Sequence, residues 1–427
     1  MVYQDIPASL VEILLSAILF ISFVLILLGR ALSWRTVFLP LFAALVLRTI
    51  AALYYRFLGM LPQGGADAVT FERRAWEWAY LGCGNLGEHL NLGSAYVHSW
   101  MVGNIYACTD RGPLVFQAIN VGFGMATVYL VARVAEELWD REAAVRAAWV
   151  AALFPMFIIN AAIPLREAWF TALFLLSVLW LVRWVRTWRL LFLLGSAAVM
   201  LSAAVLHGSA IFSLGAMGLV VIVWGGREIV RGVVTGHVKA GVFVGAVMLS
   251  GAISFGLLAL SDVRFSSIGE IGSLIDRADS LDERAATARG GSAYPGYLIP
   301  SNDIQMMALT PVRMAYALFG PPPWEVRAAV HIIGMFDGLI YLSLVILIMR
   351  YRREWWKRRE YRILLAVFLV IALVLAWGVN NFGTATRHRA KFVGILIALA
   401  AGLIGRRSWR EARLAALHRR RLSKSQA

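Results

Sequence analysis

Long apolar runs alternate with short basic stretches along almost the whole chain. A helix of about 20 apolar residues crosses the roughly 30 Å of hydrocarbon in a bilayer, and only helices or closed barrels satisfy their backbone polar groups there. The pattern therefore predicts an all-α polytopic membrane protein with about eleven transmembrane helices. The predicted spans are residues 10–29, 37–58, 113–132, 143–163, 168–182, 190–206, 209–224, 240–260, 328–349, 363–379 and 392–405.

Composition supports lipid as the main solvent of this chain. Of its 427 residues, 60% are hydrophobic and only 15% are charged, and the mean hydropathy is +0.71. A soluble domain carries about 25% charged residues, so most soluble classes are excluded. Two cysteines are too few for a disulfide framework or a thiolate zinc site.

The basic residues indicate topology. The net charge is +16, but 26 of the 41 Lys and Arg residues fall in one set of loops. The positive-inside rule makes that side cytoplasmic, with the C-terminus inside and the N-terminus outside. Arginines with Trp and Leu in the 350–362 loop and the 406–427 tail are typical of anchors on anionic membrane lipids, so no nucleic-acid partner is expected. The 26 residues lie within 30–35, 133–146, 183–189, 227–239, 350–362 and 406–424.

Four segments on the outside combine polarity with apolar surroundings, which is where function is expected in a polytopic protein. Two are the long loops 59–112 and 261–327, and two are the short stretches IPLREA and NNFGTATRHRAK. Together with the spans they are interpreted as one domain over residues 1–427. The 261–327 loop, rich in Gly, Pro and Tyr, is predicted to fold over a site as a lid.

Asp67 lies where the first loop meets an amphipathic helix, after the flexible pair Gly64 and Gly65. The structural interpretation of Asp67 is a helix N-cap. The functional one is a carboxylate at the membrane interface that takes a proton from an incoming hydroxyl.

Glu167 opens the fifth predicted span beside Arg166. It could simply complement the helix dipole and pair with this arginine. Alternatively it orients an acceptor or contributes oxygen ligands to a divalent cation.

Four basic residues in the last outside loop, Arg387, His388, Arg389 and Lys391, contradict the positive-inside tendency and need a compensating anion. A phosphate suits guanidinium groups best, and the region of Glu167 is the other candidate. Contact with lipid headgroups alone is a third interpretation.

Further candidates are weaker. Arg313, Tyr294 and Tyr297 in the 261–327 loop are substrate contacts or loop packing, and His207 is an outside polar residue of unassigned role. Cys83 and Cys108 flank the first loop, and their pairing is left open.

The order of several segments resembles one family. These segments are ADAVTFERRAWEWA, SAYVHSWMVGNIYACTD, INVGFGMATVYLVARVAEELWDREAA, FPMFIINAAIPLREAWF and a final RHRAKF. They resemble the C-type glycosyltransferase (GT-C) superfamily, in the bacterial branch similar to protein mannosyltransferases and lipid A aminoarabinose transferases. The likeness is clearest over residues 64–182.

This resemblance implies an inverting enzyme that takes a sugar from a polyprenyl-phosphate donor at the outer face of the bacterial cytoplasmic membrane. The acceptor would be a glycan, a lipid or a protein. Asp67 maps onto the catalytic residue, Glu167 onto the second-loop acidic residue, and Arg387 and Arg389 onto phosphate contacts, which Lys391 and Arg166 extend. No organic cofactor is expected, and a divalent cation stays open.

Two other classes compete with this interpretation. An O-antigen polymerase or ligase acting on polyprenyl-diphosphate glycans would need the outside arginines but not Asp67. A lipid or sugar transporter would show inverted repeats and charges near the bilayer midplane.

Overall fold

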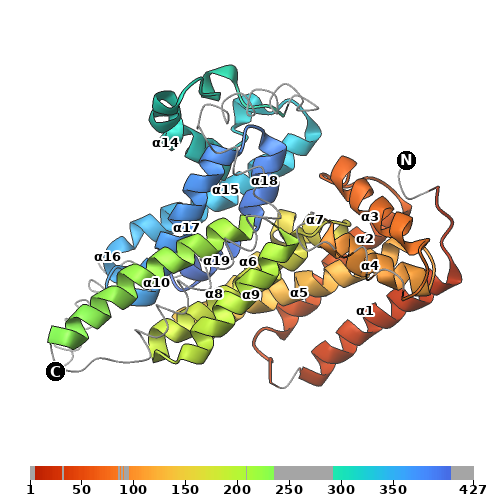
Figure 1. Cartoon of the computed structure of the whole chain (residues 1–427), viewed down its shortest axis with the longest axis horizontal. Helices are drawn as coiled ribbons and strands as arrows, with labels where there is room; N and C mark the ends of the chain where they lie inside the picture. The colour runs from red at the N-terminus through yellow and green to blue at the C-terminus, as the bar shows by residue number, and fades with distance from the viewer. Residues whose placement is uncertain are drawn as a thin grey trace, which may run out of the picture.

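The computed structural model describes residues 5–30, 33–84, 87, 90, 96–207, 209–234 and 292–404. Within these ranges the chain is helical, and its β-structure is one isolated bridge between Ala293 and Asn381. Figure 1 shows long helices side by side, with α3, α14 and α18 toward the upper end of the view. The helices are α1 (Leu10–Arg30), α2 (Phe38–Phe57), α3 (Ala66–Ala79), α4 (Val97–Cys108), α5 (Pro113–Leu138), α6 (Arg141–Leu153), α7 (Pro155–Ala162), α8 (Glu167–Thr187), α9 (Leu190–Leu206), α10 (Ser209–Val234), η2 (Gly296–Leu298), α14 (Asp303–Phe319), η3 (Pro323–Glu325), α15 (Ala329–Arg350), α16 (Arg352–Trp355), α17 (Arg359–Gly378), α18 (Phe382–Ala390) and α19 (Val393–Ala401).

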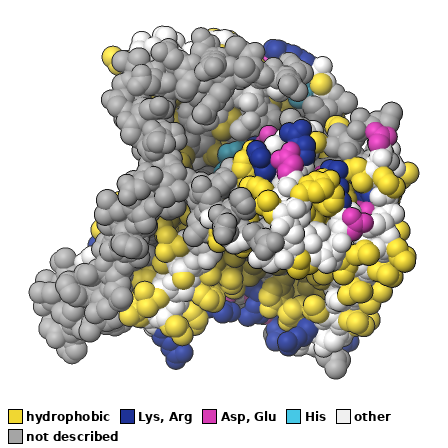
Figure 2. Space-filling view, turned by 45° about the vertical axis from the view of Figure 1, so that its right-hand side comes forward, with side chains coloured by type: hydrophobic (Ala, Val, Ile, Leu, Met, Phe, Trp, Pro, Cys, Tyr) yellow, Lys and Arg dark blue, Asp and Glu magenta, His cyan; other side chains and the backbone are white. Residues whose placement is uncertain are grey.

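The chain is a multi-pass membrane protein. Seven helices in the described ranges are long and apolar enough to cross a bilayer, and the bent pair of α6 and α7 makes up to eight. Figure 2 shows broad apolar surface on the flank of the molecule and basic side chains along its lower edge. The seven helices lie in α1, α2, α5, α8, α10, α15 and α17.

The fourth predicted span, residues 143–163, is not one straight helix. It breaks between α6 and α7, which meet at 58°. Pro155 has no N–H and disfavours helical geometry in the preceding Phe154, which is extended at ψ 118°. Arg48 explains how the break is tolerated: its guanidinium donates to the carbonyl oxygens of Ala151 and Ala152 at 3.1 Å each. An arginine inside α2 thus satisfies carbonyl groups that the proline break leaves without helical partners.

One further predicted span is wrong, and other predicted segments lie outside the described residues. The last predicted span, 392–405, contains only the nine-residue α19, which is too short to cross a bilayer as one helix. Its side chains are buried throughout, so the apolar run marks a core element rather than a lipid-facing span. The predicted span 240–260, the 261–291 part of the lid and the 406–427 tail lie outside the described residues.

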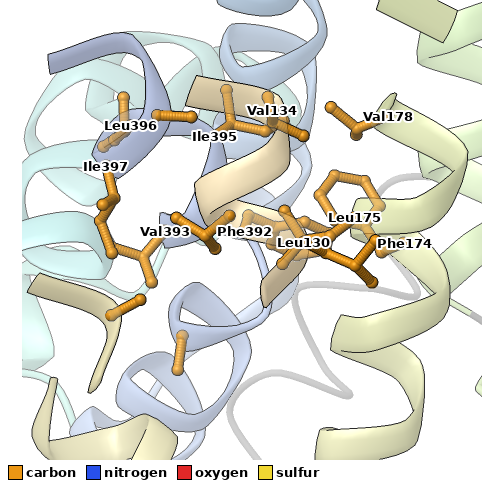
Figure 3. Packing of buried hydrophobic residues seen from close by; sticks show 14 of the residues in the cluster. Leu130, Val134, Phe174, Leu175, Val178, Phe392, Val393, Ile395, Leu396 and Ile397 are labelled. Atoms are coloured by element: carbon orange, nitrogen blue, oxygen red, sulfur yellow. The ribbon is translucent and has the colours of Figure 1, made fainter. Parts of the chain in front are cut away.

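The central core forms where α19 packs against α5, α6 and α15, with the start of α19 reaching side chains of α8 (Figure 3). Phe392 and Phe174 meet edge to face with ring centroids 5.0 Å apart. Gly394 permits this close approach, because a Cβ there would lie 2.7 Å from Leu175 Cδ2. Small residues of this kind allow helix backbones to come together where no hydrophobic driving force exists.

A buried ion pair joins α1 to the rest of the bundle. Arg56 Nε and Nη2 donate to the Glu12 carboxylate at 2.8 and 2.9 Å, and both side chains are almost fully buried. The Leu114 amide at the start of α5 also donates to Glu12, at 2.8 Å. Glu12 therefore connects α1 with α2 and with the N-terminus of α5.

Candidate active site

Hydrogen bonds at the N-terminal end of the short helix α18 fix the position of its basic side chains. The Asn381 side chain accepts a hydrogen bond from Thr384 N at 2.7 Å, which is an N-cap. Phe382 N donates to Ser292 O at 2.8 Å, within the isolated bridge. The segment around Ser292 and the cap together set the position of α18.

Helical spacing divides the basic residues of α18 between two faces. Residues four apart lie on one face, whereas residues two apart are turned by about 200°. Arg387 and Lys391 accordingly share a face, and Arg389 points the opposite way. Arg389 Nε donates to Asp337 Oδ2 at 2.8 Å, and a further guanidinium nitrogen donates to Gly334 O at 2.5 Å. Arg389, predicted to contact phosphate, is fully buried in a structural ion pair with α15.

Arg387 lies between the two predicted carboxylates. Its Nη1 donates to Asp67 Oδ2, and its Nε lies 3.3 Å from Glu167 Oε1. Asp67 is in the first turn of α3, behind the N-cap Gly65, so it is not the N-cap. Burial alone would lower the pKa of Arg387, but the carboxylates of Glu167 and Asp67 outweigh it and raise this pKa.

Glu167 is the buried centre of the cluster. Lys391 Nζ lies 3.5 Å from its Oε1, the same oxygen that Arg387 Nε contacts. The other oxygen, Oε2, is buried and accepts no hydrogen bond from the described residues. The Asp67 side chain, in contrast, is 52% exposed. The site therefore combines one accessible carboxylate with one enclosed carboxylate, and Arg387 contacts both.

Lys391 is held in a basic environment. Burial lowers its pKa to about 7; Glu167 opposes this, whereas Arg387 and Arg166 add to it. His207 Nε2 lies 2.8 Å from Lys391 Nζ. Burial and then the charge of Lys391 lower the pKa of His207 well below its usual value, so this imidazole is neutral near pH 7.

Arg166, His207 and His388 lie beside Glu167 and Lys391. Arg166 donates to Leu206 O at 3.2 Å and lies 5.3 Å from the centre of the Phe71 ring. His388 is 5.5 Å from His207, centroid to centroid, and burial, Lys391 and Arg387 together lower its pKa. Figure 2 shows acidic, basic and histidine side chains gathered on this face, surrounded by apolar ones.

A cavity of about 490 Å³ opens beside Asp67 and Arg387. This volume falls within the range of about 300 to 1,000 Å³ that is usual for small-molecule sites. Polar and apolar groups from both halves of the chain meet around it. The lining is Pro62, Gln63, Gly65, Asp67, Met156, Ser292, Pro321, Ala328, His331, Ile333, Gly334, Asn381, Phe382, Gly383, Thr384, Thr386 and Arg387.

The predicted substrate contacts of the second long loop lie elsewhere. Arg313 is fully buried and donates to Ala376 O and Val379 O at 2.9 and 3.0 Å, so it joins α14 to α17. Tyr294 is buried against other aromatic rings. Tyr297 is exposed and is hydrogen-bonded to Tyr316 through their hydroxyl groups at 2.8 Å. None of the three predicted contacts lines the cavity.

Two contacts stabilise the first long loop: a disulfide, whose formation the sequence left open, and a buried ion pair that was not predicted. Cys83 and Cys108, whose pairing the sequence left open, form a disulfide. Glu72 is fully buried and pairs with Arg111 at 2.7 Å, which the sequence interpretation missed. A signal existed, because Glu72 is four residues after Ala68 and three before Ala75, on the buried face of α3.

Two further residues near the site were not among the predicted site residues, although a carboxylate in an apolar span is a signal for Asp337. Asp337 stands in an apolar span, and its partner Arg389 is 52 residues away. His331 lines the cavity from the first turn of α15. Both depend on the tertiary position of α15 against α18.

The described residues include no group of three or more His, Cys, Asp or Glu side chains arranged to hold a metal ion. Asp67 and Glu167 both contact a guanidinium group instead. Arg387 pairs with both carboxylates, and Lys391 pairs with Glu167 as well.

Comparisons with known proteins find structural likeness only. No protein-family profile and no curated protein sequence matches the chain. The archaeal oligosaccharyltransferase AglB from Archaeoglobus fulgidus, in complex with an inhibitory peptide and a dolichol-phosphate, is similar over 88% of this chain and 54% of its own, at 14% identity and a TM-score of 0.45. The apo form of the oligosaccharyltransferase from the same organism is similar over 85% of this chain and 50% of its own, at 14% identity and a TM-score of 0.43. The chain thus spans about half the length of these structures.

Proposed function

We propose that this protein is a membrane glycosyltransferase that transfers a sugar from a polyprenyl-phosphate donor to an acceptor hydroxyl, with inversion. The observation that carries the proposal is the convergence of Asp67, Glu167 and Arg387 beside a small-molecule-sized cavity. These residues come from three distant segments of a multi-pass membrane protein. The resemblance of the sequence to GT-C enzymes assigns catalytic work to the same positions.

The geometry suits an inverting displacement. The acceptor oxygen attacks the anomeric carbon on the side opposite the phosphate, and the bond from that carbon to the phosphate oxygen breaks. Asp67, exposed at the cavity wall, takes the hydroxyl proton. Arg387 and Lys391 stabilise the charge of the departing polyprenyl phosphate.

Glu167 has a positioning role in this scheme. Its Oε1 holds Arg387 and Lys391 in place. Its Oε2 is buried and has no hydrogen-bond partner among the described residues, so a substrate hydroxyl reaches it only if the cavity extends past Arg387. We assign Arg389 to the support of α18 rather than to phosphate, because Asp337 and backbone carbonyl oxygens occupy its guanidinium group. Arg166 and the neutral imidazoles of His207 and His388 lie around Glu167 and Lys391, away from the cavity lining.

Sidedness follows from the distribution of charge. Arginines lie in the last turns of α1, α8 and α15, at the ends remote from the Asp67 site, whereas Arg56 in the last turn of α2 lies at the site end and is neutralised by Glu12. The positive-inside rule favours a cytoplasmic position for the remote ends, and this supports the proposal of a site at the outer face. The acceptor there would be a cell-envelope glycan, lipid or protein.

Charges inside the spans do not favour transport. Arg48 is bonded to carbonyl oxygens, Arg56 to Glu12, and Asp337 to Arg389. Each of these charged groups has a structural partner, whereas a transporter needs midplane charges that can exchange partners with cargo.

The test uses purified protein, acceptor-containing membrane extract and two labelled donors: a polyprenyl-phosphate monosaccharide and a polyprenyl-diphosphate glycan. Transfer from the monophosphate donor should need both Asp67 and Arg387, so Asp67→Asn and Arg387→Gln should both fail. Asp110→Asn and Arg73→Gln are matched controls, because both residues are exposed on neighbouring segments. Transfer only from the diphosphate donor, insensitive to Asp67→Asn, would instead establish a polymerase or ligase.

A further inference from the structure

The wall of the cavity is chemically divided. Its charged side chains are Asp67 and Arg387, which are hydrogen-bonded to each other. The remaining polar lining is uncharged amide, hydroxyl and imidazole, from Gln63, Ser292, His331, Asn381, Thr384 and Thr386. Groups that can both donate and accept hydrogen bonds suit a ligand whose own groups are hydroxyls.

His331 is the most strongly constrained group on this neutral wall. Its Nδ1 accepts a hydrogen bond from the backbone N–H of Arg327 at 3.2 Å. A neutral imidazole that accepts at Nδ1 carries its proton on Nε2, so Nε2 is a donor. His331 is only 4% exposed, and Nε2 has no hydrogen-bond partner in the described part of the chain. A buried donor without a partner is unfavourable, and a ligand acceptor removes that penalty.

The surroundings decide which ligand acceptor fits. A phosphate oxygen is drawn toward Arg387 and Lys391, which carry the positive charge of the site. The ring of His331 faces Phe382, with centroids 6.1 Å apart, and no carboxylate lines its part of the cavity. A neutral hydroxyl oxygen is the acceptor that this environment favours.

The cavity rim is also fixed in shape. Gln63 has a positive φ of 66°, and its Nε2 donates to Gly383 O at 3.2 Å. The Tyr55 hydroxyl donates to the neighbouring Gly64 carbonyl oxygen. The loop before Asp67 is thereby bonded to the start of α18, so the neutral wall keeps its position relative to the charged pair.

We infer that His331 Nε2–H donates to a hydroxyl group of the donor sugar, and that the neutral wall around it is the sugar subsite. This inference rests on the proposed function and adds a specificity-determining residue to it. Donors that carry a hydroxyl at the matching ring position are bound, and their deoxy analogues are discriminated against, because a site built for a hydroxyl leaves its donor unpaired without one.

Two variants separate this role from a structural one. In His331→Asn, the side-chain oxygen can still accept from Arg327 N near the position of Nδ1, but the Nε2 donor is lost. In His331→Gln, an amide N–H can replace Nε2–H, but the acceptor for Arg327 N is lost. A sugar-contact role predicts that His331→Asn is impaired and His331→Gln is largely active. A role in holding Arg327 predicts the reverse order.

The measurement is the affinity of detergent-solubilised full-length protein for undecaprenyl phosphate and for a panel of undecaprenyl-phosphate hexoses and pentoses. Wild type should bind one of the sugar donors more tightly than bare undecaprenyl phosphate. His331→Asn should lose about tenfold for that donor, the equivalent of one hydrogen bond of about 1.4 kcal/mol, and nothing for the bare lipid. A donor lacking the matching hydroxyl should bind both proteins equally.

Two outcomes would overturn the inference at different levels. If wild type prefers a sugar donor and His331→Asn binds it as tightly, the assignment of His331 is wrong and the proposed function stands. If wild type binds no donor on the panel more tightly than bare undecaprenyl phosphate, the sugar subsite and the proposed function are both wrong.

Discussion

Replacing Asp337 by Asn isolates the contribution of a buried charge pair to the position of α18. Asp337 and Arg389 are both fully buried, with Arg389 Nε 2.8 Å from Asp337 Oδ2. The substitution keeps the shape of the side chain but leaves the guanidinium charge without a counter-ion in a low-dielectric environment.

Breaking a fully buried ion pair by removing one partner costs about 3 to 5 kcal/mol, because the remaining charge is not compensated. We expect that loss in the free energy of unfolding of Asp337→Asn. Removing both charges together, in Asp337→Leu with Arg389→Met, should recover most of it, since paired apolar replacements are often neutral or stabilising.

The assay is denaturant unfolding in detergent, combined with binding of undecaprenyl phosphate. Glu77→Gln is the matched control, because it breaks the exposed pairs with Arg73 and Arg74, and exposed pairs contribute about 0 to 1 kcal/mol each. The double variant should bind undecaprenyl phosphate like wild type, whereas Arg387→Gln should bind it weakly. A double variant of wild-type stability that loses binding as strongly as Arg387→Gln would refute the reasoning and restore Arg389 as a phosphate contact.

Three further results are expected. Because the pKa of Lys391 is lowered to about 7, its positive charge is present below that pH and lost above it. The KM for the donor should therefore rise with pH above 7 in wild type and stay constant in Lys391→Met. An equal pH dependence of KM in both proteins would contradict this. The double variant of Cys83→Ala with Cys108→Ala should lose about 3 kcal/mol of stability by unfolding in detergent, since the bond closes a loop over a separation of 25 residues, and unchanged stability would count against it. Transfer activity should survive EDTA, because Arg387 supplies the positive charge between Asp67 and Glu167, and restoration of a lost activity by a divalent cation would show the opposite.

The sequence predicted the all-α membrane fold because apolar runs of span length are a one-dimensional signal. It failed where tertiary contacts decide the outcome. Pro155 breaks a helix that looked continuous, and Arg48, about a hundred residues earlier, makes the break tolerable. Residues 392–405 read as a span, although their helix is a short core element.

The candidate site, like the fold, was predictable only where a local sequence signal exists. The residue types around Asp67, Glu167 and Arg387 were evident, because charges outside a membrane domain and next to apolar runs stand out. The sequence did not show that these three residues lie together, because their proximity depends on how α3, α8 and α18 pack. The separation of Arg387 from Arg389 follows from helical geometry once α18 is known to be a helix. His331 could not be found from sequence, because its importance arises from the neighbouring Arg327 amide and the cavity.

The most direct test of the account is the initial rate of sugar transfer by Asp67→Asn at saturating polyprenyl-phosphate donor, relative to wild type. A positioned general base contributes about 10²- to 10⁴-fold, so a loss of that size is expected while donor affinity stays within about threefold. Equal transfer rates for the two proteins would contradict the central claim that Asp67 is the catalytic base.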